Sequence, residues 1–192
     1  VYTIPTGTPF QLTASGSDVD GDNLTYSWEQ YDLGPAGAPD APTGTAPRFR
    51  AYNPTASPVR TFPRLESILS GEDIFGDVLQ AGNLEMNFRV VVRDNNPVGG
   101  AINTADVQVL VEQTEEPFIV TSQSEPRTSY TGGSVQEVTW NVAGTTQGEI
   151  GTQNVKILFS DNGGQSFDYT LDEMTANDGF ALIRFPEVVT SE

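Results

Sequence analysis

The 192-residue sequence contains no cysteine and no histidine. The lack of cysteine excludes disulfides and thiol nucleophiles, and the two absences together remove the usual zinc ligands. The lack of histidine also removes the general base of Ser–His–Asp and Cys–His catalytic sites. We therefore predict that this chain has no catalytic residues and is not itself an enzyme.

Basic residues are few, because nine Lys and Arg stand against 26 Asp and Glu, for a net charge of −17. Such a chain repels phosphate, which makes nucleic acid a poor partner, whereas a hard divalent cation would relieve part of the self-repulsion. The sequence also lacks a run of about 18 apolar residues, so we expect no membrane span. Residues 1–10 have no Met, no basic start and no apolar core, unlike a signal peptide. We therefore expect a piece of a longer protein.

Strand patterns recur along the chain, and helix patterns are rare. The strand-like stretches are short, rich in Val, Thr, Phe and Tyr, and bounded by Gly, Asn, Asp and Pro, which is typical of sandwiches. Within residues 24–31, Leu24, Tyr26 and Trp28 alternate with polar residues, and this period of two predicts a half-buried strand. The predicted fold class is all-β, with two tandem immunoglobulin-like β-sandwiches.

A charged, proline-containing turn, "EQTEEPF" at residues 112–118, interrupts the strand patterns and predicts a domain boundary. The predicted domains are residues 1–114 and residues 115–192. The second domain shows five or six strand patterns, fewer than the roughly seven of a complete sandwich. We expect it to be truncated at its C-terminus, with residues 187–192 extended and peripheral.

A long Pro/Gly-rich insertion, residues 31–83, lies inside the first predicted domain. It carries apolar anchors and the stretch "PRLESILSG", so we predict an ordered cover on the sandwich that includes a short helix. Four of the nine basic residues lie in this insertion, namely Arg48, Arg50, Arg60 and Arg64. Two interpretations stay open: these side chains pair with the domain's own carboxylates, or they form a basic binding patch.

Three aspartates, Asp18, Asp20 and Asp22, alternate in the stretch "ASGSDVDGDNLTYSWEQY". Their spacing approaches that of an EF-hand loop, but Gly21 takes the fourth position instead of the sixth, and the flanking segments are strands. Carboxylates this close repel one another, and calcium, which takes six to eight oxygen ligands in irregular geometry, would neutralise them. The alternative is a solvated Asp/Gly turn.

In an immunoglobulin-like strand order, strand B would be residues 9–15, strand C 24–31, strand F 84–94 and strand G 105–113. The B–C and F–G loops of that fold lie at the same end, which predicts two further ligands. The strand at 84–94 would deliver Asp94 to this end, and the strand at 105–113 would begin there with Asp106. Glu29, along strand C, is a weaker candidate. We also expect the N-terminal strand to run antiparallel to strand B. The predicted metal ligands are Asp18, Asp20, Asp22, Asp94 and Asp106.

Residue type alone leaves open a glycosidase that uses two carboxylates. The acidic residues, however, are predicted to cluster at one loop end and not to face each other across a cleft. In the second domain, "SDNGGQSF" at residues 160–167 resembles the Asp-box hairpin of sialidases, with Asn162 in place of its Asp. That motif shapes a turn and does no chemistry, so we expect a structural role.

Nearly the whole chain resembles the accessory region that follows the catalytic domain in secreted bacterial reprolysin-like zinc metalloproteases. The first domain also resembles PKD and cadherin-like calcium-binding modules, and the second is expected to be fibronectin-like. The segments that carry the resemblance are "IPTGTPFQLTASGSDVDGDNLTYSWEQYD", "PRFRAYNPTASPVRTFPRL", "NFRVVVRDNNPVGG", "VTWNVAGT", "NVKILFSDNGGQSF" and "NDG".

The resemblance implies a bacterial protein that is secreted or displayed on the cell surface, with calcium at Asp18, Asp20 and Asp22. The chain would be a non-catalytic spacer or targeting module of a hydrolase, and its partner would be an upstream catalytic or sandwich domain of the same chain. The alternative is a fragment of a surface adhesin that binds protein or glycan. In either case we expect a monomer.

Overall fold

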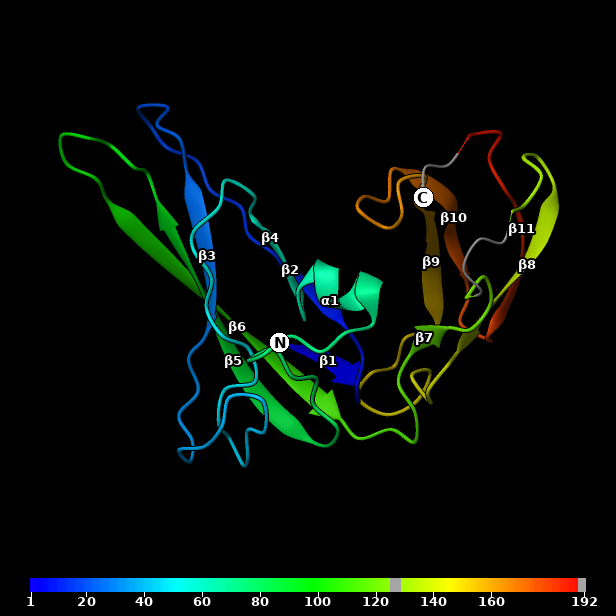
Figure 1. Cartoon of the computed structure of the whole chain (residues 1–192), viewed down its shortest axis with the longest axis horizontal. Coiled ribbons are helices and arrows are strands. Elements are labelled where there is room, and N and C mark those ends of the chain that lie inside the picture. Colours follow the sequence, from blue (N-terminus) through cyan, green and yellow to red (C-terminus); the bar gives the residue numbers. More distant parts are fainter. Residues whose placement is uncertain (125–128, 190–192) are drawn as a thin grey trace. The chain divides into compact units, whose positions relative to one another are not determined.

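The computed structural model of the chain describes residues 1–124 and 129–189. It divides into two compact units, one formed by Val1–Ile4 and Pro9–Val111, the other by Pro5–Thr8 and Glu112–Glu192. The principal division lies between Val111 and Glu112, directly before the charged turn at residues 112–118. Nearly all regular structure is β-strand, as predicted (Figure 1). No helix in the described ranges is long and apolar enough to cross a membrane.

The first unit contains a four-stranded sheet in the order β1-β6-β5-β3 and a two-stranded antiparallel sheet of β2 and β4. The central strand β5 runs antiparallel to both β3 and β6. The N-terminal strand β1 pairs with β6, and β2 pairs with β4. The strands are β1 (Tyr2–Pro5), β2 (Phe10–Thr13), β3 (Thr25–Gln30), β4 (Val59–Phe62), β5 (Leu84–Arg93) and β6 (Ile102–Glu112).

The core of the first unit is built around aromatic rings. Phe62 stacks on Phe10 at 5.0 Å between ring centroids and meets the edges of Phe49 at 5.2 Å and Phe88 at 4.9 Å. Phe49 and Phe62 come from the Pro/Gly-rich insertion, which is therefore an ordered cover on the sheet, as predicted. The insertion also forms the expected short helix α1 (Leu65–Ser70), which ends at Gly71 with a positive φ of 70°.

The second unit contains a two-stranded sheet, β10-β9, and a three-stranded sheet, β11-β8-β7. Its core consists of Val138, Trp140, Ala181, Ile183 and Phe185. The strands are β7 (Ile119–Val120), β8 (Val135–Asn141), β9 (Asn154–Phe159), β10 (Tyr169–Ala176) and β11 (Phe180–Arg184). Separate sheets around one core in each unit are compatible with β-sandwiches. Part of the segment expected to be extended and peripheral, residues 190–192, lies outside the described residues.

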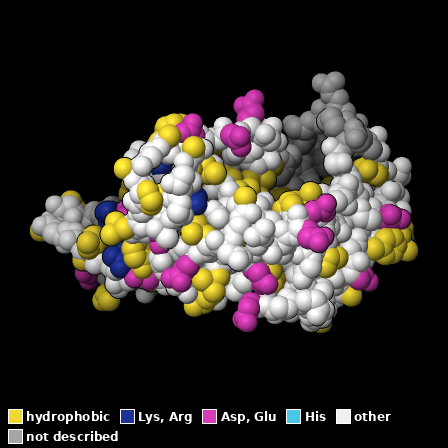
Figure 2. Space-filling view, turned by 90° about the horizontal axis from the view of Figure 1, so that it is seen from below, with side chains coloured by type: hydrophobic (Ala, Val, Ile, Leu, Met, Phe, Trp, Pro, Cys, Tyr) yellow, Lys and Arg dark blue, Asp and Glu magenta, His cyan; other side chains and the backbone are white. Residues whose placement is uncertain are grey.

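The surface reflects the composition. Figure 2 shows Asp and Glu side chains spread over the displayed face, with few Lys and Arg among them. Two parts of the first unit contain the charged residues singled out in the sequence. One is the pair of loops that carries most of the predicted metal ligands, and the other is a group of arginines in the insertion.

Candidate functional site

The loop between β2 and β3 is folded around Asp18. One carboxylate oxygen, Oδ1, accepts hydrogen bonds from the backbone N–H groups of Asp20 at 2.9 Å and Asp22 at 3.0 Å. Gly21 makes the turn between them with a φ of 82°, a conformation that side chains disfavour. Asp20 is exposed, and its carboxylate makes no hydrogen bond within the described chain. The loop therefore holds its shape through Asp18 and presents Asp20 to solvent.

Asp94 plays the corresponding part in the loop between β5 and β6. Both of its carboxylate oxygens accept from the backbone N–H of Ala101, each at 2.9 Å. One of them, Oδ1, also accepts from the backbone N–H of Asn96 at 3.2 Å. Asp94 thus closes a short loop by bonding across it, in the manner of a carboxylate that organises a turn.

Two asparagines connect these loops. The Asn96 side-chain amide donates to the carboxylate of Asp22 at 2.7 Å, and Asn95 donates to the backbone carbonyl of Asn23 at 2.8 Å. The predicted convergence of the two loops is therefore present for Asp22 and Asp94, which both bond to Asn96. Sequence reasoning missed the two asparagines. The available signal was their position directly after the strand that delivers Asp94.

The structure places Asp106 away from these loops. Strand β6 begins at Ile102, three residues earlier than expected, because its ladder with β5 continues as far as the Arg93–Ile102 pair. Asp106 is therefore a mid-strand residue opposite Arg89, and Asp94 lies five residues further along β5. At ~3.3 Å per residue, that is a separation of about 16 Å along the sheet. Asp106 does not join the other predicted ligands.

Asp106 has a different partner on its own sheet. The Arg89 guanidinium donates to both carboxylate oxygens, at 2.7 and 2.8 Å, and the Tyr31 hydroxyl lies 3.4 Å from the second one. The hydrogen bonds from Arg89 hold the pKa of Asp106 below its usual value. This cross-strand pair is an exposed ion pair on the outer face of the sheet.

The donor chemistry of the loops suits calcium, which binds carboxylate and carbonyl oxygens. In the arrangement found, however, Asp18 and Asp94 direct their oxygens at backbone N–H groups. Within residues 1–124 and 129–189, no three or more His, Cys, Asp or Glu side chains are grouped so that they could hold a metal ion. No ion pair in these ranges includes Asp18, Asp20, Asp22 or Asp94.

A long groove runs beside the loops. It has a volume of about 1060 Å³, and Asp18, Asp94 and Asp106 all contribute to its lining. Its walls are otherwise largely apolar and include Trp28 and Val90. The β2–β4 sheet has only two strands, so it covers only part of the four-stranded sheet. Asp106 lines the groove as a residue of β6, but its carboxylate bonds to Arg89 on the outer face of the sheet, so the three aspartates do not meet at one point.

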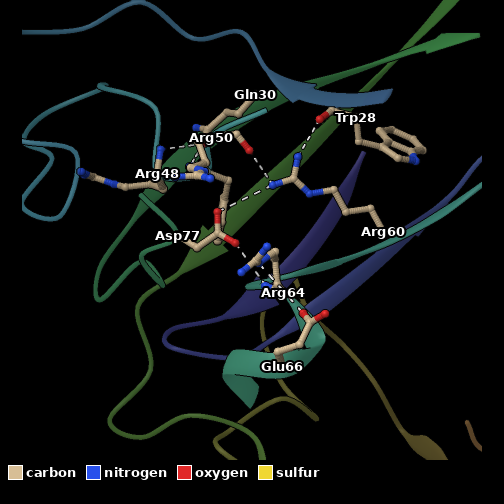
Figure 3. A network of polar contacts seen from close by, with 9 residues as sticks. Trp28, Gln30, Arg48, Arg50, Arg60, Arg64, Glu66 and Asp77 are labelled. Carbon is tan, nitrogen blue, oxygen red and sulfur yellow. Dashed lines mark hydrogen bonds and ion pairs between the residues drawn. The ribbon is translucent and has the colours of Figure 1, made fainter. Parts of the chain in front are cut away.

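The arginines of the insertion gather in a second place, around Tyr52. The guanidinium carbons of Arg50, Arg60 and Arg64 lie 4.9, 4.7 and 4.7 Å from the centroid of its ring. Figure 3 shows three of these arginine side chains and Asp77 close together. We call Arg50, Arg60, Arg64 and Tyr52 the arginine cluster. Arg48 is not part of this cluster. Its guanidinium donates to the Gln80 side chain and to the Gly44 carbonyl.

The cluster contains one buried carboxylate. Asp77 has a fully buried side chain, lies 3.7 Å from Arg60 and accepts from the backbone N–H of Arg64 at 3.2 Å. Burial raises the pKa of Asp77, although the bond from Arg64 and the charge of Arg60 oppose this change. Burial likewise lowers the pKa of Arg60. Two of these arginines pair with carboxylates of their own domain: Arg60 with Asp77 at 3.7 Å, and Arg64 with Glu66 at 4.0 Å. Within the described chain, such pairing does not account for Arg50.

The second unit uses its candidate polar residues to shape turns. The Asn162 side chain accepts from the backbone N–H of Ser166 at 2.9 Å, and Ser160 accepts from the backbone N–H of Gly164 at 2.7 Å. This turn joins β9 to β10. Asp161 accepts from the Tyr169 hydroxyl at 3.1 Å, a bond that raises the pKa of Tyr169. These bonds describe the structural role expected for the Asp-box-like motif.

The first unit therefore has two candidate functional sites, the linked acidic loops and the arginine cluster. The resemblance to metalloprotease accessory regions rests on the sequence segments that carry it. Comparisons of the chain with protein-family models, with curated proteins and with solved structures found no match.

Proposed function

We propose that this chain is a non-catalytic accessory module, a spacer or targeting region, of a secreted bacterial hydrolase. Its two units would be immunoglobulin-like sandwiches, PKD- or cadherin-like in the first and fibronectin-like in the second. By the sequence resemblance, the parent enzyme would be a zinc metalloprotease. The first unit would bind calcium at its linked acidic loops.

One observation carries the calcium proposal: Asn96 joins the loop of Asp22 to the loop of Asp94. This contact brings together two acidic segments that are 74 residues apart in the sequence. Carboxylates brought close without basic partners repel one another, and a hard divalent cation reduces that repulsion. The residues proposed to hold calcium are Asp18, Asp20, Asp22 and Asp94. Asp106 is left out because of its mid-strand position opposite Arg89.

Bound calcium would supply positive charge and link the two loops at one end of the first unit. The side chains of Asp18 and Asp94 already hold the loops in shape through backbone N–H groups. The Asp20 carboxylate accepts no hydrogen bond within the described residues and is exposed, so it is the carboxylate best placed to bind a cation. The expected role is mechanical, because a stiffened loop end suits a spacer between domains.

The non-catalytic part of the proposal is supported by residue chemistry. There is no histidine to act as a general base. Asp18 and Asp94 hold turns, and Asp106 lies in an ion pair. We expect no turnover of casein or of common glycosides by the purified chain. Turnover that disappears after a point substitution within these residues would contradict the proposal.

Calorimetry with calcium and with EGTA tests the calcium site. A site held at about 100 times its dissociation constant adds roughly 2.7 kcal/mol to the free energy of unfolding. Chelation should therefore lower the transition temperature of the first unit and leave that of the second unchanged. A thermal transition that ignores calcium, or a shift confined to the second unit, would refute the site.

Two alanine variants sharpen this test. Asp20→Ala removes a charge without breaking a hydrogen bond of the loop, so it should make the first unit indifferent to chelator. Asp106→Ala is the matched control, because it removes an aspartate about 16 Å from Asp94 along the sheet. It should keep the full calcium response. If Asp106→Ala loses the response and Asp20→Ala keeps it, the proposed ligand set is wrong.

A further inference from the structure

The arginine cluster concentrates positive charge in an otherwise acidic chain. Three guanidinium groups lie within 4.9 Å of one tyrosine ring, whereas the chain as a whole has a net charge of −17. One fully buried carboxylate, Asp77, faces them. Glu66 lies 4.0 Å from Arg64, so among the described residues Arg50 is the member of the cluster with no carboxylate within ion-pair distance. Stacking on Tyr52 is favourable for each guanidinium, but it does not remove the repulsion between them.

Several hydrogen-bond donors of the cluster make no hydrogen bond within the described residues. The Nε atoms of Arg60 and Arg64 and the Tyr52 hydroxyl are buried, and none of them makes a hydrogen bond within the described chain. The Tyr52 hydroxyl faces Asp77 closely enough to affect the pKa of both groups, without reaching normal bond geometry. The Arg50 guanidinium makes no hydrogen bond or ion pair in the same part of the chain. Asp77 Oδ1 is a buried acceptor that is also unpaired and lies beside Tyr52 and Arg60, and Glu66 lies 4.0 Å from Arg64 Nε. Among the described residues, the guanidinium of the cluster without any acceptor is therefore that of Arg50.

The spacing of the guanidinium groups suits one small acceptor. Arg50 and Arg64 each lie within 4.9 Å of the same ring centroid, so their guanidinium carbons are less than 10 Å apart. Two guanidinium groups that bind one oxyanion from opposite sides stand about 8 Å apart, given N–H···O distances of about 2.8 Å. Arg50 is exposed and the Arg64 side chain is 40% exposed, so an anion can reach both from solvent.

A small cavity adjoins the cluster at Arg50. Its volume is about 310 Å³, and its lining includes Pro39, Pro47, Phe49, Arg50 and Gly76. The stem of Arg50 is packed so closely on Gly76 that a Cβ at this glycine would lie 3.0 Å from it. Close packing here limits how far the Arg50 stem can move, so the guanidinium is held beside the cavity. The cavity could take a small apolar group attached to an anion.

We propose that the arginine cluster is a binding site for a small oxyanion, such as sulfate or a short carboxylic acid. Arg50 and Arg64 supply the accessible donors, and Arg60 supports them from the buried side. Guanidinium groups match such anions because their N–H donors form a planar fork. A long polyanion is a poorer ligand, because the acidic surface of the chain would repel it. This proposal does not depend on calcium binding.

Side-chain NMR of the arginine Nε–Hε groups tests the site directly, with sodium sulfate as the probe at constant ionic strength set by sodium chloride. We expect saturable shifts at Arg50, Arg60 and Arg64. The substitutions Arg50→Gln and Arg64→Gln should each weaken sulfate binding about tenfold, because each removes a charge-assisted bond. Neither side chain makes a hydrogen bond in the described residues, so the fold should tolerate both changes.

Arg184→Gln is the matched control, because Arg184 lies in the second unit and donates to the Gly133 carbonyl. It should leave sulfate binding unchanged. A second experiment compares the binding of butyrate with that of acetate. If butyrate binds more tightly, the ligand is an organic acid whose apolar group enters the cavity. If the two bind equally, the ligand is a free inorganic anion. Shifts that grow linearly without saturation, or equal binding by Arg50→Gln, Arg64→Gln and the unsubstituted protein, would overturn the proposal.

Discussion

Gln30, at the end of β3, attaches the Pro/Gly-rich insertion to the sheet through a single oxygen. Its side-chain carbonyl accepts the backbone N–H groups of Arg48 at 2.7 Å and Phe49 at 3.1 Å, and its amide donates to Asp32 at 2.7 Å. Gln30 is 8% exposed and Phe49 is 2% exposed, so water cannot easily replace these bonds. We predict that Gln30→Leu strongly destabilises the first unit.

The size of the effect follows from the bonds lost. A buried donor left without a partner costs about 1–3 kcal/mol, so two orphaned N–H groups cost about 2–6 kcal/mol. The larger apolar surface of leucine returns about 1–2 kcal/mol on burial. The net loss should lie between about 0 and 5 kcal/mol, with a midpoint of about 2.5 kcal/mol, against the roughly 5–15 kcal/mol that stabilises a domain.

Urea unfolding and amide hydrogen exchange measure this loss. Exchange at the Arg48 and Phe49 amides should accelerate in Gln30→Leu more than exchange in the centre of β5. The matched control is Gln108→Leu, because within the described residues the Gln108 side chain bonds only to the Glu85 and Asn87 side chains. We expect the control to change the free energy of unfolding by less than about 0.5 kcal/mol. Equal stability of the two variants, or unchanged exchange at both amides, would refute the reasoning.

Two further predictions concern single buried residues. Asn177, which is 4% exposed, accepts from the Trp140 indole N–H and donates to Thr145 and Thr152. Asn177→Ala should therefore lower the stability of the second unit by about 2–4 kcal/mol in calorimetry and spare the first, and a loss confined to the first unit would contradict it. Burial raises the pKa of Asp77 in the folded protein above its ordinary value of 3.8. The folded state therefore binds the proton more tightly than the unfolded state, and the contribution of Asp77 to the free energy of unfolding should fall as the pH rises from 3.8 through the folded-state pKa. In urea unfolding at a series of pH values, the stability of the unsubstituted protein minus that of Asp77→Asn should decrease across this window, and an increase would show that the sign is wrong.

Local sequence pattern was enough to locate most of the strands. The period-two alternation of Tyr26 and Trp28 predicts β3, and both side chains are buried in the structure. The insertion was recognisable as an ordered cover because its aromatic residues need burial. These features depend on neighbouring residues, which a strand presents to alternate faces whatever its partner is. The Asp/Gly composition of the loop at 14–24 similarly predicts a turn before the rest of the fold is known.

The candidate sites depended on partners that are distant in the sequence. Asp106 was expected at a loop end, but the ladder between β5 and β6 continues to Ile102 and places it opposite Arg89. No pattern within either strand records how far their pairing extends. The contact of Asn96 with Asp22 likewise required the two loops to be set side by side by β3 and β5.

The arginine cluster is the clearest case. The sequence shows that four of nine basic residues lie in the insertion, but it leaves open whether they pair with carboxylates or form a patch. The answer depends on where Asp77 and Tyr52 come to lie among them. Residue composition and alternation determined the strands, because a β-strand needs only its own side-chain pattern to have a buried face. Tertiary structure decided the sites, because charge balance depends on which distant side chains packing brings within a few ångströms.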